Sequence, residues 1–240
     1  CKQTEPNRYR LIVADHFDLI IRSQEFNQHF NTINTDFEAI KQYIGVRLYP
    51  KAYVAELDAS FTLGKEFAGD IFAMLVFDLP DSVTNIKPEL LPHWNKSVDE
   101  LFELGKRNIQ ENYPIEISKE AFEGFSIIFG SADHFFTPNI VLDLENQPEL
   151  VGTYGSLIGL PHRHAALFYP IERMEIVVAI NGLIPAIYGM HEEGPGSLSN
   201  HLFWYYKGTF TELPYQLEAG KLQFFPPEGF VDLLNQLTKN

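Results

Sequence analysis

The sequence has almost no cysteine, few basic residues and no long apolar run. A single cysteine among 240 residues excludes an internal disulfide framework and a cysteine-rich zinc site. Eighteen Lys and Arg against 32 Asp and Glu give a formal net charge of −14, so the average surface repels phosphate backbones and we expect no nucleic-acid partner. The longest apolar run, Ile176 to Met190, is interrupted by Asn181 and Pro185. It is shorter than the roughly 20 residues of a transmembrane helix, so we expect no transmembrane segment.

The one cysteine is residue 1, and three interpretations of it stay open. It is a chain boundary without chemical meaning, the acylated cysteine of a mature bacterial lipoprotein, or the nucleophile of an N-terminal nucleophile enzyme. No partner for a nucleophile can be named, and lipoproteins usually carry a longer polar tether than Lys2 to Asn7. We therefore expect a cytoplasmic protein, with lipid anchoring through Cys1 at a bacterial membrane as the alternative.

The composition is that of a folded protein, because 45% of the residues are hydrophobic and can form a substantial core. Strand-like and helix-like segments mix without strict βαβ alternation. This favours an α+β fold with a mixed or mainly antiparallel sheet and helices packed largely on one side. We expect an N-terminal strand–helix–strand segment, residues 1–66, packed on a main domain, residues 67–240, or else one continuous domain over residues 1–240.

Apolar residues recur every three or four positions in the segments that we expect to be helical. Ser23 to Ile44 carries six large apolar residues on one stripe. Ser97 and Glu100 have the spacing of a capping box, which predicts a helix that continues to Ile109. The remaining predicted helices are Glu172 to Gly189, kinked or ended near Pro185, and Phe230 to Leu237. Val177, Val178 and the interruption at Pro185 would also suit a strand in the first of these segments.

Runs of β-branched and aromatic residues predict strands. The nearly unbroken apolar run from Ile71 to Phe77 is typical of a central strand covered on both faces. Lys207-Gly208 is a connection of hairpin length between two such runs. The predicted strands are Tyr9 to Ile21 (one or two strands), Val46 to Tyr49, Ala52 to Leu57, Ala68 to Leu79, Gly124 to Phe129, Asn139 to Leu144, Gly155 to Leu160, Ala165 to Tyr169, Leu202 to Tyr206 and Thr209 to Leu213.

The polar cluster of most interest is Pro161-His162-Arg163-His164, which lies between two apolar runs. On a strand, the spacing of His162 and His164 would place both rings on one face, where they could supply two nitrogen ligands to a divalent metal. The plainer interpretation is that Arg163 and one histidine bind backbone carbonyls around Pro161. Candidates by type for a third metal ligand are Asp133, His134, His191, Glu192 and Glu193.

Features between Ile71 and Leu213 resemble the YtpQ-like family, bacterial proteins grouped as a domain of unknown function. They are the apolar strand, the helix that follows His93-Trp94, the segment from Leu160 to His164, and the final hairpin around Lys207-Gly208. The Pro-His segment and the hairpin carry most of the resemblance. The family has no agreed activity, so the resemblance implies no catalytic residues.

The sequence favours a non-enzymatic binding or protein-interaction module. No nucleophile elbow, P-loop or HExxH motif is present, and we expect no cofactor. The alternative is a metal-assisted hydrolase that uses His162 and His164. We expect a protein or small-molecule partner, with these candidate binding residues: His162, Arg163, His164, His191 and Glu192.

Overall fold

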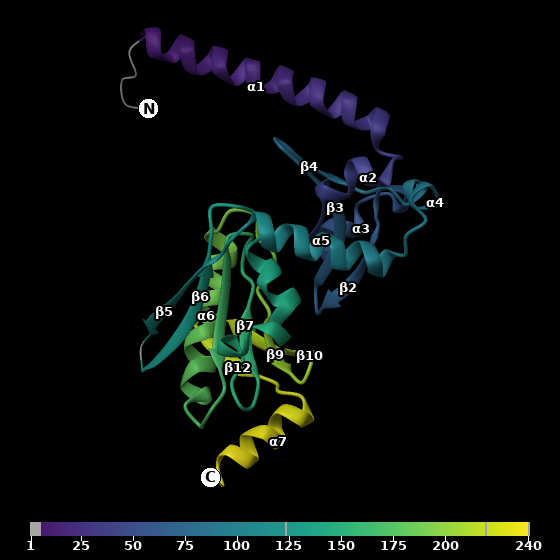
Figure 1. Cartoon of the computed structure of the whole chain (residues 1–240). Coiled ribbons are helices and arrows are strands. Elements are labelled where there is room, and N and C mark those ends of the chain that lie inside the picture. Colours follow the sequence, from purple (N-terminus) through teal and green to yellow (C-terminus); the bar gives the residue numbers. More distant parts are fainter. Residues whose placement is uncertain (1–5, 123, 219, 240) are drawn as a thin grey trace.

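The computed structural model describes residues 6–122, 124–218 and 220–239 (Figure 1). Cys1 therefore lies outside the described residues. Within them the protein is an α+β fold, and each pairing between neighbouring strands is antiparallel, which confirms the predicted fold class. No helix in the described part of the chain is both long and apolar enough to cross a membrane.

The first sheet, sheet A, has four strands arranged around β3. The Leu75 backbone N–H bonds to the carbonyl of Leu63, and its carbonyl accepts from Ile86 N–H, so β2 and β4 lie one after the other along the same edge of β3. β1 occupies the other edge. The run from Ile71 to Phe77 is thus a central strand, as predicted. The bounds are β1 (Ile44–Pro50), β2 (Gly64–Ala68), β3 (Ile71–Leu79) and β4 (Ser82–Asn85).

The second sheet, sheet B, has six strands in the order β10-β9-β7-β8-β6-β5. The predicted hairpin at its edge is confirmed: Lys207 and Gly208 both have positive φ, as a two-residue turn requires. The bounds are β5 (Glu116–Phe122), β6 (Phe125–Ser131), β7 (Ser156–Gly159), β8 (Ala165–Pro170), β9 (Leu202–Tyr206) and β10 (Thr209–Leu213), and a separate pair is formed by β11 (Tyr215–Glu218) and β12 (Lys221–Phe224).

The helices differ widely in length. The capping box at Ser97 is present, since its hydroxyl accepts from Glu100 N–H and the Glu100 carboxylate accepts from Ser97 N–H. The bounds are α1 (Pro6–Ile33), α2 (Phe37–Ile40), α3 (Lys51–Ala55), α4 (Leu91–Trp94), α5 (Val98–Asn112), α6 (Ile176–Glu193) and α7 (Glu228–Leu237), with 3-10 turns η1 (Lys41–Tyr43), η2 (Ala59–Phe61), η3 (Pro88–Leu90), η4 (Thr137–Asn146) and η5 (Pro148–Leu150).

The central strands β7 and β8 of sheet B are buried on both faces. Successive side chains of a strand point in opposite directions, so each strand contributes to two cores. On β7, Leu157 packs into a core with α6 and α7, while Ile158 packs into a second core shared with sheet A. On β8, Leu167 and Phe168 divide in the same way. The two sheets therefore share one apolar core, and α6 and α7 cover the far side of sheet B.

Helix α5 lies directly on sheet A because two glycines face each other there. A Cβ on Gly105 would lie 2.8 Å from the carbonyl carbon of Gly45 on β1, closer than real Cβ contacts allow. Two asparagine side chains then bind outward carbonyls of β1: the Asn108 amide donates to Ile44 O at 2.8 Å, and the Asn139 amide donates to Val46 O at 2.6 Å. These contacts cover an edge of β1 that would otherwise be open.

The predicted strand from Tyr9 to Ile21 is wrong, since this segment belongs to α1. Figure 1 shows the N-terminal end of α1 extending away from the other elements, so these residues have no sheet to join. Val13, Phe17 and Ile20 are exposed and are spaced at helical intervals. An apolar strand needs a packed face, whereas a helix satisfies its backbone hydrogen bonds within itself.

Four further predictions need correction. The predicted helix from Ser23 to Ile44 is interrupted after Ile33, because the Asp36 side chain accepts from Glu38 N–H and starts α2 afresh. Ala52 to Leu57 is not a strand, since α3 begins directly after Pro50. Asn139 to Leu144 lies in η4, where the Asn139 side chain bonds to β1. The helix expected to kink or end near Pro185 continues to Glu193.

Candidate functional site

The segment from Pro161 to His164 forms a turn between β7 and β8, not a strand. His162 makes an isolated bridge to Ser197, and Arg163 N–H donates to Gly196 O at 3.1 Å. Gly196 has φ +68, and a Cβ there would lie 2.8 Å from Arg163 Cδ. The loop after α6 therefore packs closely on this turn and holds the Arg163 side chain in place.

The two histidine rings of the turn form hydrogen bonds with neighbouring backbone groups and with Arg163. Arg163 Nε–H donates a hydrogen bond to His164 Nε2 at 3.1 Å. The hydrogen of the neutral His164 ring is therefore on Nδ1, which donates to Ala132 O at 3.0 Å. His162 Nδ1 accepts from His164 N–H at 3.2 Å. Burial lowers the pKa of His162, and electrostatic interactions with His164 and Arg163 lower it further. Both ring nitrogens of His164 are thus already engaged.

The remaining predicted residues, His191 and Glu192, lie at the C-terminal end of α6. Their side chains contact each other at 3.3 Å, and the Ser197 hydroxyl donates to His191 O at 2.6 Å. Within the described residues, no group of three or more His, Cys, Asp or Glu is arranged to hold a metal ion. The metal-assisted hydrolase that uses His162 and His164 stays a prediction.

A cavity of about 450 Å³ opens beside Arg163, and we call it the arginine cavity. Both Arg47 of β1 and Arg163 line it, and its lining among the described residues includes no Asp or Glu. Neither arginine makes an ion pair in the described part of the chain. The other lining residues are Leu48, Tyr49, Pro50, Tyr53, Val83, Asn85, Gly196, Ser197 and Leu198.

Aromatic rings hold both guanidinium groups at this cavity. The Cζ atoms of Arg163 and Arg47 lie 4.5 Å and 5.2 Å from the centroid of the Phe135 ring. Arg47 Cζ is also 4.8 Å from the Tyr49 ring, which stacks on Tyr53 with centroids 5.3 Å apart. Guanidinium groups that stack on rings keep their in-plane N–H groups for hydrogen bonds. The series Tyr53, Tyr49, Arg47, Phe135, Arg163 is therefore a continuous row of rings and cations.

Tyr49 supplies a hydroxyl donor beside the two cations. Burial raises the pKa of Tyr49, and the neighbouring Arg47 lowers it to a smaller extent, so the phenol keeps its proton at neutral pH. With two guanidinium groups, which stay protonated in proteins, the cavity has donors and positive charge but no carboxylate from the described residues.

Sequence reasoning singled out Arg163 but missed Arg47, Tyr49, Tyr53 and Phe135. The antiparallel alignment of β1 with β3 places Arg47 opposite Met74 on a face that also carries Tyr49. Alternation along Val46-Arg47-Leu48 could have indicated a side chain that points out of the core. Nothing in the sequence indicates that this face of β1 meets the turn at Arg163, because that contact depends on how the two sheets pack.

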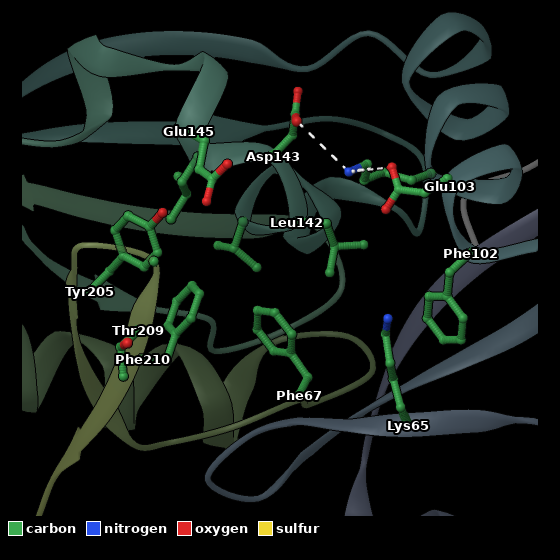
Figure 2. Close-up of a pocket in the computed structure, with 14 residues that line it drawn as sticks. Lys65, Phe67, Phe102, Glu103, Leu142, Asp143, Glu145, Tyr205, Thr209 and Phe210 are labelled. Atoms are coloured by element: carbon green, nitrogen blue, oxygen red, sulfur yellow. Dashed lines mark ion pairs between the residues drawn. The ribbon is translucent and has the colours of Figure 1, made fainter. Parts of the chain in front are cut away.

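A second, larger cavity of about 520 Å³ lies between α5, η4 and the β9–β10 hairpin (Figure 2). Lys106 forms ion pairs with two carboxylates, at 3.0 Å from Glu103 and 3.9 Å from Asp143. Dashed lines mark the two ion pairs at Glu103 and Asp143 in Figure 2. Lys65 lies 4.3 Å from the Phe102 ring and 3.5 Å from Asp99. The charges of this cavity largely compensate one another, whereas those of the arginine cavity do not.

Comparison of the chain with models of protein families, with curated proteins and with solved structures finds no match. The resemblance to the YtpQ-like family therefore stays a prediction, and the chemistry of the site rests on its own geometry.

Proposed function

We propose that this protein is a binding protein that takes a small anionic ligand in the arginine cavity. The observation that carries the proposal is the pair Arg47 and Arg163, both stacked on Phe135 and both without a carboxylate partner among the described residues. The ligand would present a carboxylate or a phosphate to the two guanidinium groups. This is a binding role, in keeping with the non-enzymatic module that the sequence favours.

The charge balance of the whole chain makes this pair unusual. The protein has 14 more acidic than basic residues, so carboxylates are abundant for pairing with exposed cations. Two guanidinium groups near one ring repel each other and gain from an anion between them. Planar guanidinium groups bind carboxylate and phosphate oxygens through two parallel N–H bonds, which suits them to this task.

The experiment is calorimetric titration of the full chain with inorganic phosphate and with acetate. Removing one charged hydrogen-bonding partner, in Arg163→Gln or Arg47→Gln, should weaken binding by about tenfold or more. Arg107→Gln is the matched control, because Arg107 is exposed on α5, lies outside the cavity lining and loses the same charge. The proposal fails if neither anion binds, or if Arg107→Gln weakens binding as much as the cavity variants do.

The Arg163→Lys variant separates the geometry of the site from its charge. Lysine keeps the positive charge but loses the planar fork and the stacking on Phe135. We expect binding weaker than in the wild type and stronger than in Arg163→Gln. Equal affinity of Arg163→Lys and the wild type would mean that the positive charge alone determines anion affinity, and that the planar shape of the guanidinium group does not contribute.

A further inference from the structure

The edge strand β5 of sheet B is open along its whole length. It is the last strand in the order of the sheet, so β6 pairs with one of its edges and no strand of the described residues pairs with the other (Figure 1). All seven of its residues are exposed, whereas β10 at the opposite edge of the sheet has only Thr209 exposed. Alternate residues of an antiparallel edge strand turn their N–H and C=O groups outward, where a further strand can bind them.

Charged residues protect this edge, with neither proline nor bulge to help them. β5 contains no proline, and its alignment with β6 runs from Glu116 to Phe122 without a shift. Prolines and β-bulges are two other means of preventing an edge strand from pairing with further strands. Lys119 and Glu120 lie next to each other in the middle of β5, and Lys119 makes no ion pair among the described residues. The Lys119 charge is therefore available to a strand that comes alongside.

The charges of β5 oppose pairing between two copies of the strand. Antiparallel strands related by a two-fold axis meet around a residue that lies opposite itself. Centring on Lys119 or Glu120 places like charges directly opposite each other. Centring on Ser118 places Glu116 opposite Glu120, and a centre nearer either end leaves most of the strand unpaired. Like charges directly opposite destabilise a sheet, whereas a partner with the reversed charges stabilises it.

We propose that β5 is a docking edge for an extended segment of another protein, which pairs antiparallel with it and carries an acidic residue opposite Lys119 and a basic residue opposite Glu120. Cβ atoms of directly opposite residues lie about 4.5–5.5 Å apart, so both ion pairs follow from the strand pairing itself. An apolar residue of the segment would cover Ile117, which is 45% exposed. No residue of β5 is among the described residues that line the arginine cavity, so this inference does not depend on the proposed function.

The test uses two synthetic peptides as long as β5 and identical in composition and net charge. In Ile-Thr-Lys-Glu-Thr-Val-Thr, antiparallel pairing places the lysine opposite Glu120 and the glutamate opposite Lys119. In Ile-Thr-Glu-Lys-Thr-Val-Thr the two charges are exchanged. Each peptide is titrated into the full chain, and NMR shift changes of the backbone amides report binding. We expect the first peptide to bind about five- to tenfold more tightly, with the largest shift changes in β5.

An exchange of charges in the protein should reverse this preference. Lys119→Glu combined with Glu120→Lys keeps the net charge of the chain and should favour the second peptide. Glu218→Lys combined with Lys221→Glu is the matched control, because these residues lie opposite each other on β11 and β12 and their exchange leaves β5 unchanged. The control variant should keep the preference of the wild type.

Three results with the peptides overturn the inference: no binding of either peptide, equal binding of both, or a preference that does not reverse when the charges of β5 are exchanged. A dimer of the wild type in sedimentation, with the β5 amides protected from hydrogen exchange, also overturns it, because the occupant of the edge would then be a second copy. Each of these results leaves the anion site of the arginine cavity standing.

Discussion

The contact between Gly105 and Gly45 gives a sharp prediction for Gly105→Ala. In the interior of a helix this substitution normally stabilises by about 1 kcal/mol, because glycine is the poorer helix former. Here the new Cβ would lie 2.8 Å, 3.1 Å and 3.2 Å from the carbonyl carbon, the oxygen and the Cα of Gly45. These are backbone atoms, so no side chain can rotate away and α5 must shift from β1.

Overpacking of this kind costs about 1–3 kcal/mol, which outweighs the gain in helix propensity. We expect Gly105→Ala to lower the free energy of unfolding by about 1–2 kcal/mol. Gly189→Ala in α6 is the matched control, since a Cβ there would meet no atom within 4 Å. It should raise the free energy of unfolding by about 0.5–1 kcal/mol.

Urea denaturation followed by circular dichroism measures both variants. A Gly105→Ala protein as stable as the wild type would refute the reasoning, because it would mean that α5 can move off β1 without loss. Arg47 lies two residues after Gly45 on the same strand. We therefore also expect Gly105→Ala, but not Gly189→Ala, to weaken anion binding in the arginine cavity.

Three other predictions concern stability. Ser97→Ala removes the capping box of α5 and should cost about 1 kcal/mol in a urea titration, with no loss if the cap is unimportant. Asn108→Ala leaves the carbonyl of Ile44 without its side-chain donor and should cost about 1–3 kcal/mol; faster amide exchange in β1 would support this, and unchanged stability would contradict it. The pKa of His162 is lowered in the fold, so the wild type should lose stability as pH falls below about 6.5, while His162→Gln should lose less between pH 8 and pH 5. Parallel pH profiles of the two proteins would contradict the last prediction.

Where the sequence alone predicted structure well, the signal was local. The capping box at Ser97 and the two-residue turn at Lys207 depend on bonds between residues a few positions apart, and both are present as expected. The run from Ile71 to Phe77 was predicted as a central strand because strands covered on both faces are apolar at successive positions. Such signals do not depend on distant parts of the chain.

The errors arose where packing decides the structure. Leu19, Ile20 and Ile21 suggested a strand by their β-branched and apolar character, but the N-terminal end of α1 extends away from both sheets and this segment is helical. The candidate site was found only in part for the same reason. Arg163 stood out beside two histidines, whereas Arg47 became visible only once β1 and the turn were seen to meet at Phe135.

The paired edges of β3 also bear on how the protein avoids aggregation. Met74-Leu75-Val76-Phe77 is short, uncharged and apolar, the composition of peptides that assemble into cross-β fibrils. In the fold, β1 covers one side of it, and β2 and β4 cover the other between them. A fibril-forming peptide from another molecule can reach this segment only after sheet A has opened. Loss of the short strand β4 would therefore be enough to leave backbone N–H and C=O groups of β3 unpaired and open to pairing with another molecule.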